Sequence, residues 1–342
     1  MDDGLIFEDP IPSNRPSSLP TKEKDPSHRA NKRIIVIAGP TAVGKSRLSL
    51  ELAKILDGEI ISADSVQVYR GMDIGTAKVS LEDRLLIPHH LIDFCDLSDS
   101  FNVLRFYECA RSACLDSLAA NRVPILVGGT GFYLHALLYG PPKGPPASPE
   151  IRKQLEEDLK KFGPEALYDR LKHYDPIYAK TISLRDRHKI VRGLEIIALT
   201  GQKVSDFPRP NPSHFPLEFD FRCWFVYFPT DILYPRIEMR CDEMIAKDFV
   251  KEVQELEKKG LRENRSAAQA IGYRQCLDFL NSNRTDEDWE HFVWQFKKVS
   301  RRYAKRQFTW FRREKLFHWL DLDVHGYQKA IELILQDYES RY

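Results

Sequence analysis

The stretch Ile34-Ile-Val-Ile-Ala-Gly-Pro-Thr-Ala-Val-Gly-Lys-Ser46 decides the fold of this chain. Its first four residues form a β-branched run, typical of a buried strand, and the residues from Ser46 to Leu56 are apolar at helical spacing. Between them, residues 39–46 match G-x-x-x-x-G-K-[ST]. A strand, this loop and a helix in that order predict a phosphate-binding loop. Its predicted phosphate-binding residues are Gly39, Pro40, Thr41, Ala42, Val43, Gly44, Lys45 and Ser46.

The loop predicts phosphate and nucleotide binding, ATP included, but it does not specify a reaction. Within it, Lys45 is expected to reach terminal phosphates and Ser46 to bind Mg²⁺. Nucleotide hydrolases and kinases usually add an acid after a second strand. The strand predicted at 123–127 is followed by Gly-Gly-Thr, whereas Asp64 follows the strand predicted at 59–63. A nucleotide hydrolase or a small-molecule kinase therefore stays open on the loop alone.

Strand patterns alternate with helical patterns along much of the chain, and a further strand is predicted at 222–228. This alternation predicts an α/β fold, with a P-loop NTPase-like core built on a parallel sheet and a helical C-terminal region. Pro- and Gly-rich breaks at 140–149 and 207–216 flank a helical segment. We therefore predict a disordered tail at 1–30, a core at 31–142 and 206–342, and a helical insertion at 143–205.

Composition excludes several classes of protein. The 342 residues carry a formal net charge of +1, so charge as a whole makes no case for nucleic acid. The six cysteines lack zinc-finger or C-x-x-C spacing, which favours free thiols in a reducing compartment. No apolar run is long enough to span a membrane, so no membrane partner is expected. The acidic N-terminus favours the cytoplasm; a plastid or mitochondrial location stays open if a leader was trimmed.

Charge is concentrated locally between Lys297 and Lys315, where nine basic residues face one acid, Glu314. This segment belongs to a long amphipathic helix predicted at 289–313, which indicates a surface for nucleic-acid phosphates. Arg301, Arg302, Lys305 and Arg306 are the predicted contacts. An ordinary solvated helix face is the alternative. The predicted apolar stripe of the helix consists of Phe292, Phe296, Val299, Tyr303 and Trp310.

Seven blocks, in order from residue 34 to about residue 320, resemble the tRNA dimethylallyltransferase (tRNA isopentenyltransferase) family. Because no zinc-finger spacing is present, the resemblance is closer to the bacterial type. The blocks are GPTAVGKS (39–46), ADSVQVYRGMDIGTAK (63–78), PHHLID (88–93), VGGTGFYLHALL (127–138), RIEMR (236–240), AIGYRQ (270–275) and RRYAKRQFTWFRR (301–313).

The resemblance implies transfer of a dimethylallyl group from dimethylallyl diphosphate to N6 of the adenosine 3′ of the anticodon in tRNA. Because the N6 lone pair is delocalised, the attack needs a general base, and the family's catalytic Asp matches Asp64. Arg240 matches the family's diphosphate-binding Arg, and Thr41 could donate to the bridging oxygen. The alternatives for Asp64 are a helix cap and an acid that binds Mg²⁺ through water. The alternative for Arg240 is a surface ion pair with Asp242, Glu243 or Glu238.

Several blocks also match the family's tRNA contacts, and the insertion would then hold the anticodon stem loop. An unpaired loop base is cheaper to flip than a paired one. The chain is expected to act as a monomer. The alternatives are an adenylate isopentenyltransferase, which makes cytokinin nucleotides from free AMP, ADP or ATP, and a non-enzymatic RNA-binding module. The implied contacts are Asp64, Ser65, Val66, Gln67, Thr130, Arg152, Arg187, His188, Lys189, Ile190, Val191, Gln269, Ala270, Ile271, Gly272, Tyr273 and Arg274.

Overall fold

Six parallel strands form one sheet in the computed structural model, which describes residues 32–208 and 218–340. The strand order is β3-β2-β4-β1-β5-β6. The predicted tail at 1–30 lies outside the described residues. The strands are β1 (Arg33–Ala38), β2 (Gly58–Ala63), β3 (His89–His90), β4 (Val123–Gly128), β5 (Asp220–Tyr227) and β6 (His318–Asp321).

The apolar run that begins the chain's first motif is the central strand β1. It pairs with β4 on one side and β5 on the other, and residues 34–38 are completely buried. A strand covered on both faces has no solvent side, so its sequence shows no alternation. The predicted strands at 34–37, 59–63, 123–127 and 222–228 are confirmed, with small shifts at their ends.

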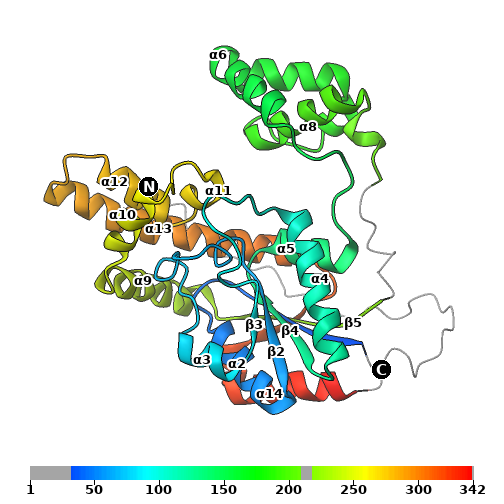
Figure 1. Cartoon of the computed structure of the whole chain (residues 1–342), viewed down its shortest axis with the longest axis vertical. Helices are drawn as coiled ribbons and strands as arrows, with labels where there is room; N and C mark the ends of the chain where they lie inside the picture. Colours follow the sequence, from blue (N-terminus) through cyan, green and yellow to red (C-terminus); the bar gives the residue numbers. More distant parts are fainter. Residues whose placement is uncertain (1–31, 209–217, 341–342) are drawn as a thin grey trace. The chain divides into compact units, whose positions relative to one another are not determined.

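Connections between the strands place helices on both faces of the sheet. The chain passes from β1 through α2 (Lys45–Leu56) to β2, and then returns through α4 (Val103–Ala119) to β4. Because parallel crossovers are right-handed, these opposite directions put α2 and α4 on opposite faces. Later in the chain, α14 (Leu322–Glu339) packs against α2 and β5 (Figure 1). The α/β class with a parallel sheet is therefore confirmed.

The remaining helices of unit 1 include a C-terminal group that follows β5. Its longest member is α13 (Asp286–Phe311), which begins with a reciprocal cap. The Thr285 hydroxyl accepts from the Asp288 N–H, and the Asp288 carboxylate accepts from the Thr285 N–H. The predicted helix at 289–313 is thus confirmed, starting earlier. These helices are α3 (Leu81–Leu86), α5 (Gly131–Tyr139), α9 (Thr230–Ala246), α10 (Phe249–Lys258), α11 (Arg265–Ala268), α12 (Tyr273–Leu280) and α13 (Asp286–Phe311).

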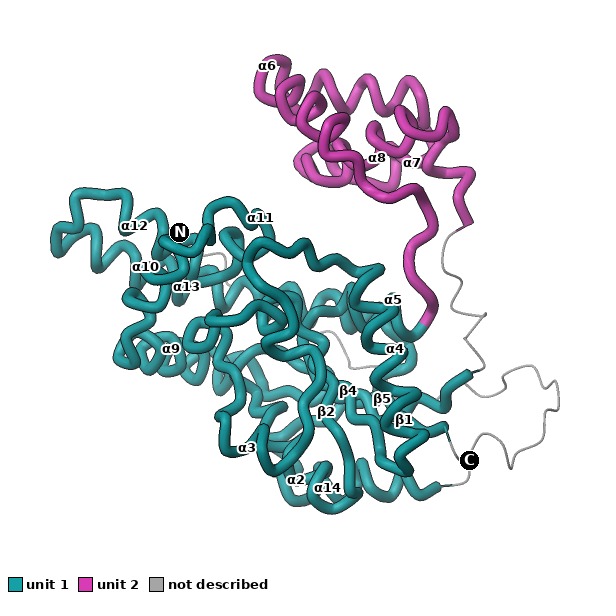
Figure 2. The backbone as a smooth tube through the Cα atoms, viewed as in Figure 1, with its two compact units in different colours: residues 1–138, 216–342 teal, residues 139–215 magenta. Residues whose placement is uncertain are grey.

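A second compact unit lies within Tyr139–Phe215, slightly wider than the insertion predicted at 143–205 (Figure 2). It contains α6 (Pro149–Tyr174), α7 (Pro176–Ala179), α8 (Arg187–Thr200) and the short 3₁₀ helix η1 (Val204–Asp206). The Ser148 hydroxyl caps α6 by accepting from the Ile151 N–H at 3.3 Å. The core of this second unit is made of Leu155, Leu167, Leu171, Ala179, Ile190, Val191 and Leu194.

Candidate active site

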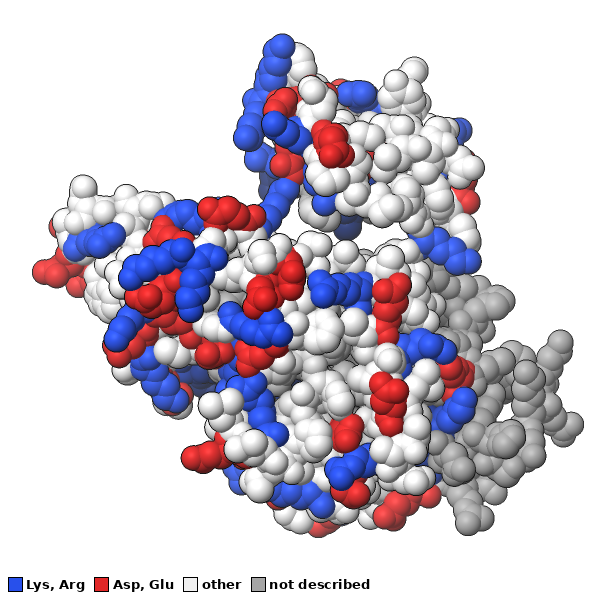
Figure 3. Space-filling view, viewed as in Figure 1, with Lys and Arg blue, Asp and Glu red and all other residues white. Residues whose placement is uncertain are grey.

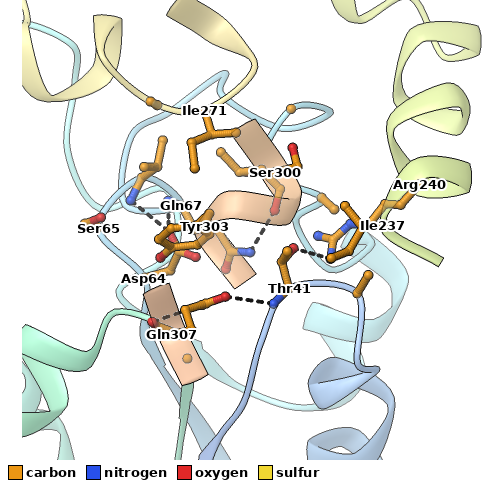
Figure 4. Close-up of a pocket in the computed structure, with 18 of the residues that line it drawn as sticks. Thr41, Asp64, Ser65, Gln67, Ile237, Arg240, Ile271, Ser300, Tyr303 and Gln307 are labelled. Carbon is orange, nitrogen blue, oxygen red and sulfur yellow. Dashed lines mark hydrogen bonds between the residues drawn. The ribbon is translucent and has the colours of Figure 1, made fainter. Parts of the chain in front are cut away.

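A cavity of about 580 Å³ lies at the carboxyl ends of β1, β2 and β4 in unit 1 (Figure 4). Parallel α/β sheets bind ligands at this edge, because the loops that follow their strands meet there. The phosphate loop, the loop after β2, α9, the turn before α12 and α13 all contribute walls. The sequence-predicted residues in its lining are Thr41, Ala42, Gly44, Lys45, Ser46, Asp64, Ser65, Val66, Gln67, Arg240, Gln269, Ala270, Ile271, Tyr273 and Arg306.

The phosphate loop leads directly into the N-terminus of α2. Gly44, at the N-cap, has φ 92° and supplies no side-chain cap, and the first turn of the helix contains no acid. The first backbone N–H groups and the positive end of the helix dipole are therefore available to an anion. The Lys45 ammonium donates to the carbonyl oxygens of Gly39 and Pro40, both at 2.9 Å. This geometry fits the predicted phosphate cradle.

Burial lowers the pKa of Lys45 to about 7, and the positive charge of Arg240 adds to the effect, while Asp64 opposes it. Burial also lowers the pKa of Arg240, and Asp64 again opposes the shift. Both cations therefore lie in a low-dielectric wall where a bound anion gains more electrostatic stabilisation than it would in water.

Three C-terminal helices each hold one residue of the phosphate loop. Gln307 Oε1 on α13 accepts from the Thr41 N–H at 3.0 Å. Arg236 Nε on α9 donates to the Ala42 carbonyl at 3.3 Å, and the Tyr327 hydroxyl on α14 donates to the Val43 carbonyl at 2.6 Å. The sequence motif does not reveal Gln307 or Tyr327, because they lie more than 260 residues from the loop.

Arg240 and Thr41 meet across the cavity. Arg240 Nη1 donates to Thr41 Oγ1 at 3.2 Å. The sequence left open a surface ion pair between Arg240 and Asp242, Glu243 or Glu238. Within the described ranges Glu238 and Asp242 pair instead with Arg301 and Lys297, and Arg240 has no ion pair. Its guanidinium is thus directed at the phosphate loop, where it could neutralise a leaving diphosphate.

Asp64 lies on the wall next to the phosphate loop, immediately after β2. Its Oδ1 accepts from the backbone N–H groups of Val66 at 2.9 Å and Gln67 at 3.2 Å. The carboxylate is thereby fixed through one oxygen, while among the described residues no donor engages Oδ2. The structural cap considered from the sequence is therefore present, and it leaves one oxygen available for a proton.

Tyr303 lines the cavity near Asp64, and Thr130 binds the backbone next to Asp64. The Ser65 N–H donates to Thr130 Oγ1 at 3.3 Å, and Thr130 also hydrogen-bonds Tyr303. Burial raises the pKa of Tyr303 to about 12, and the negative charge of Asp64 contributes. Tyr303 therefore stays a neutral phenol beside the carboxylate. The sequence assigned it to the apolar stripe, and the structure corrects this assignment, because its ring faces the cavity (Figure 4).

A carboxylate from α10 organises another wall of the cavity, the loop 72–76. Glu252 accepts from three consecutive backbone N–H groups, those of Asp73, Ile74 and Gly75, at 2.9, 2.6 and 3.1 Å. It also accepts from the Tyr273 hydroxyl at 2.6 Å. These three N–H groups form a concave surface of the kind that binds anions, and the carboxylate of Glu252 occupies it. The sequence gave no signal for it, since α10 carries several similar acids.

The basic residues of α13 lie in different environments, and Lys298 contacts the ring of Trp294. Lys297 and Arg301 form ion pairs with acids of α9, Asp242 and Glu238. Arg302, Lys305 and Arg306 are exposed. On the face of unit 1 shown in Figure 3, Lys and Arg side chains are interspersed with Asp and Glu. The predicted phosphate contacts are therefore best represented by the three exposed residues.

The buried face of α13 differs from the predicted stripe. Trp310 is 39% exposed and contacts Phe132 edge to face, so its assignment to the buried stripe is wrong. Polar residues were not considered for this face, yet small and polar side chains occupy it because the helix packs closely on α9 and on the phosphate loop. The buried residues are Phe292, Phe296, Ser300, Ala304, Gln307 and Phe311.

The predicted tRNA contacts of unit 2 fall into different environments. Arg187, His188 and Lys189 are exposed on the first turn of α8. Ile190 and Val191 are 0% and 6% exposed, so the prediction is wrong for these side chains, which form the core of the unit. A motif match assigns whole blocks and cannot separate the inward positions of a helix from the outward ones.

Arg152 is positioned by a buried acid. Glu195, whose side chain is fully buried, accepts from Arg152 Nη2 at 2.7 Å and from Arg192 Nη1 at 2.6 Å.

In unit 1, Tyr273 is fully buried, so it contributes to the wall of the cavity rather than to an exposed surface. Gln269 and Arg274, on either side of residues 270–273, are exposed.

The parallel sheet, the phosphate loop and the acid beside it define a P-loop α/β protein whose cavity also opens onto a basic helix. The chain belongs to the IPP transferase family, whose model matches residues 67–314. No helix in the described part of the chain is both long and apolar enough to cross a membrane.

Relatives and solved structures agree with this family. The chain is 55% identical to a tRNA dimethylallyltransferase of Protochlamydia amoebophila, over 94% of each chain. It is 49% identical to the protein of the same name from Chlamydia pneumoniae, over 89% of each. The crystal structure of the tRNA isopentenylpyrophosphate transferase from Bacillus halodurans is 38% identical, with a TM-score of 0.66, covering 91% of this chain and 98% of that one.

A eukaryotic dimethylallyltransferase, described as acting on tRNA, has a TM-score of 0.72 at 29% identity. The match covers 89% of this chain and 79% of that one. The bacterial relatives are thus covered almost completely, whereas part of the eukaryotic protein has no counterpart in the match.

Proposed function

We propose that this protein transfers a dimethylallyl group from dimethylallyl diphosphate to N6 of the adenosine 3′ of the anticodon in tRNA. One observation carries the proposal beyond the names of the relatives. A single cavity brings together a phosphate cradle, the pair Arg240–Thr41 and the carboxylate of Asp64. Those are the groups that the two halves of the reaction require, namely departure of a diphosphate and removal of a proton from an amine.

In the reaction, a bond forms between N6 and the first carbon of the prenyl group, and the bond from that carbon to the diphosphate oxygen breaks. Asp64 takes the proton that N6 loses, through the oxygen that no backbone N–H holds. Lys45, Arg240 and the N–H groups of the loop stabilise the charge on the departing diphosphate. Inorganic diphosphate and the modified tRNA are the products.

The residues at the loop also fit Mg²⁺. Ser46 is exposed at the start of α2 and lines the cavity. Mg²⁺ keeps several waters and usually takes only one or two protein ligands together with substrate phosphates, so a single hydroxyl beside a phosphate cradle suits it. Bound there, the ion would further neutralise the diphosphate. Ser46 would hold it, and Lys45 and Arg240 in the same cavity contribute to the same neutralisation.

The acceptor is bound through its backbone and through one extruded base. Arg302, Lys305 and Arg306 lie along one helix that borders the cavity, which suits an RNA strand whose target base enters it. An unpaired loop base pays less to leave its stack than a paired base. A monomeric enzyme is part of this proposal.

The test uses full-length protein, dimethylallyl diphosphate with Mg²⁺, and a synthetic anticodon stem loop. Nucleosides are released and analysed by mass spectrometry. We expect prenylated adenosine from the stem loop, and none from a stem loop in which guanosine replaces the target adenosine. Free AMP is offered in parallel. If AMP is modified and the RNA is not, the adenylate isopentenyltransferase replaces this proposal, and if neither acceptor reacts, the transferase function is refuted.

A further inference from the structure

The side chain of Gln307 is a buried amide with both of its polar atoms in use. It is 4% exposed and lies on α13. Its Oε1 accepts from the Thr41 N–H at 3.0 Å, and its Nε2 donates to the Gly129 carbonyl at 3.0 Å. Because one partner can only donate and the other can only accept, these contacts fix the orientation of the amide. Gln307 thereby joins the phosphate loop to the end of β4.

The backbone around this amide leaves no spare room. A Cβ placed on Gly129 would lie 2.1 Å from Gln307 Nε2 and 3.3 Å from the Gly39 carbonyl oxygen. A side chain at position 129 would therefore displace the Gln307 amide from its place beside the end of β4. An apolar side chain of equal size would leave the Thr41 N–H and the Gly129 carbonyl without these partners, and a buried polar group left unpaired is destabilising.

The residue held by Gln307 is the one that meets Arg240. Thr41 is fixed at its backbone by Gln307 and at its hydroxyl by Arg240 Nη1. The next residue, Ala42, has φ 65°, a conformation that costs a non-glycine residue free energy and persists only where its surroundings hold it. Without the hydrogen bond from the Thr41 N–H to Gln307, this part of the loop would relax, and the direction of the Thr41 hydroxyl would change.

We propose that Gln307 is a positioning residue for the transfer reaction, which holds Thr41 so that its hydroxyl and the Arg240 guanidinium face the departing diphosphate. The proposal rests on the proposed function. It also gives α13 a second task, because Arg306, the neighbour of Gln307, lines the same cavity. One turn of this helix thus borders the site of the acceptor while it fixes the site of the donor.

The test replaces the amide without changing its size. Gln307→Met removes both hydrogen bonds. Gln307→Glu keeps an acceptor for the Thr41 N–H, but it places a carboxylate oxygen against the Gly129 carbonyl oxygen. We expect single-turnover rates with saturating tRNA and donor to fall about 10–100-fold, as for a misplaced reacting group. The dissociation constant for tRNA should stay within about twofold of the wild type. Gln295→Met on the same helix, whose amide forms an exposed hydrogen bond with His291, is the matched control and should keep the full rate.

A double-mutant cycle separates positioning from general stability. In a Thr41→Ala background there is no hydroxyl to aim, so Gln307→Met should add at most a few-fold further loss. If the two losses instead multiply in full, or if Gln307→Met transfers at the wild-type rate, the inference is overturned. Should Gln307→Met melt below the assay temperature, Gly129→Ala, which presses on the same amide, is tested in the same cycle. A wild-type protein that prenylates no acceptor would refute the proposed function itself, whereas an active wild type with an equally active Gln307→Met refutes only this inference.

Discussion

Lys45 and Arg240 line the same cavity, and the charge of Arg240 adds to burial in lowering the pKa of Lys45 to about 7. Between that value and the ordinary pKa of a lysine, about 10.4, the unfolded chain binds a proton that the folded chain has released. The contribution of Lys45 to the free energy of unfolding therefore rises with pH across this window. A bound diphosphate reverses the balance, because its negative charge favours the ammonium.

Binding of dimethylallyl diphosphate at pH 8.5, in the absence of tRNA, should consequently take up close to one proton per site. At this pH the donor is already fully ionised, since the terminal phosphate of an ester titrates at about pH 6. Calorimetry in Tris and in HEPES gives the proton count from the difference in binding enthalpy. The control is Lys45→Arg, which stays charged and should show no buffer dependence. Equal enthalpies for the wild type in both buffers would disprove the shift.

Asp64→Asn should lower the single-turnover rate about 10²–10⁴-fold, the usual loss for a general base. The amide oxygen of Asn can still accept from the N–H groups of Val66 and Gln67, so the loop should keep its shape. Filter binding should show unchanged tRNA affinity. A rate close to that of the wild type would exclude Asp64 from proton removal.

Removal of Arg301, Arg302, Lys305 and Arg306 together should weaken tRNA binding and flatten its dependence on salt. Each lost phosphate contact lowers the slope of log K against log[salt] by about 0.7–0.9. Arg301→Ala alone should change the slope less than Arg302→Ala, because Glu238 already pairs with Arg301. Lys329→Ala on α14 serves as the control, and thermal melts check folding. An unchanged slope in the folded quadruple variant would contradict a phosphate-binding role for α13.

Glu252→Gln should destabilise the protein and slow the transfer. It replaces a carboxylate that accepts four hydrogen bonds, and a buried donor left without a partner costs about 1–3 kcal/mol. Loosening of the loop 72–76 also disturbs Thr76, a lining residue of the cavity. Glu255→Gln, on the exposed side of the same helix, should have neither effect. Equal melting temperatures for the two variants would show that the clamp on this loop is unimportant.

Much of the fold could be predicted because its strongest signals are local. The buried run at 34–37 and the glycines after it specify a strand, a loop and a helix within 23 residues (34–56). The strands β3 and β6 were not predicted, because two and four residues are too few to show a period. The start of α6 also has a local signal, because Ser148 caps the helix within three residues and Pro149 is its first residue.

Only those residues of the candidate site that a sequence motif itself identifies could be predicted. Lys45, Asp64 and Arg240 meet in one cavity as the resemblance implied. Gln307 and Glu252 were missed because their partners are backbone atoms, and backbone atoms leave no trace in a sequence. The same limit explains the error at Ile190, since its burial depends on how α8 packs against α6.

The three tethers on the phosphate loop set the order in which a newly made chain can become competent. Val43 leaves the ribosome 284 residues before Tyr327, the last residue to hold the loop. At a synthesis rate of about 5–20 residues per second, that interval lasts about 15–60 s. During it the nascent chain already carries a complete Gly-rich motif, but not the helices that shape it. Capture of diphosphates from the cell is thus deferred until α14 has been translated.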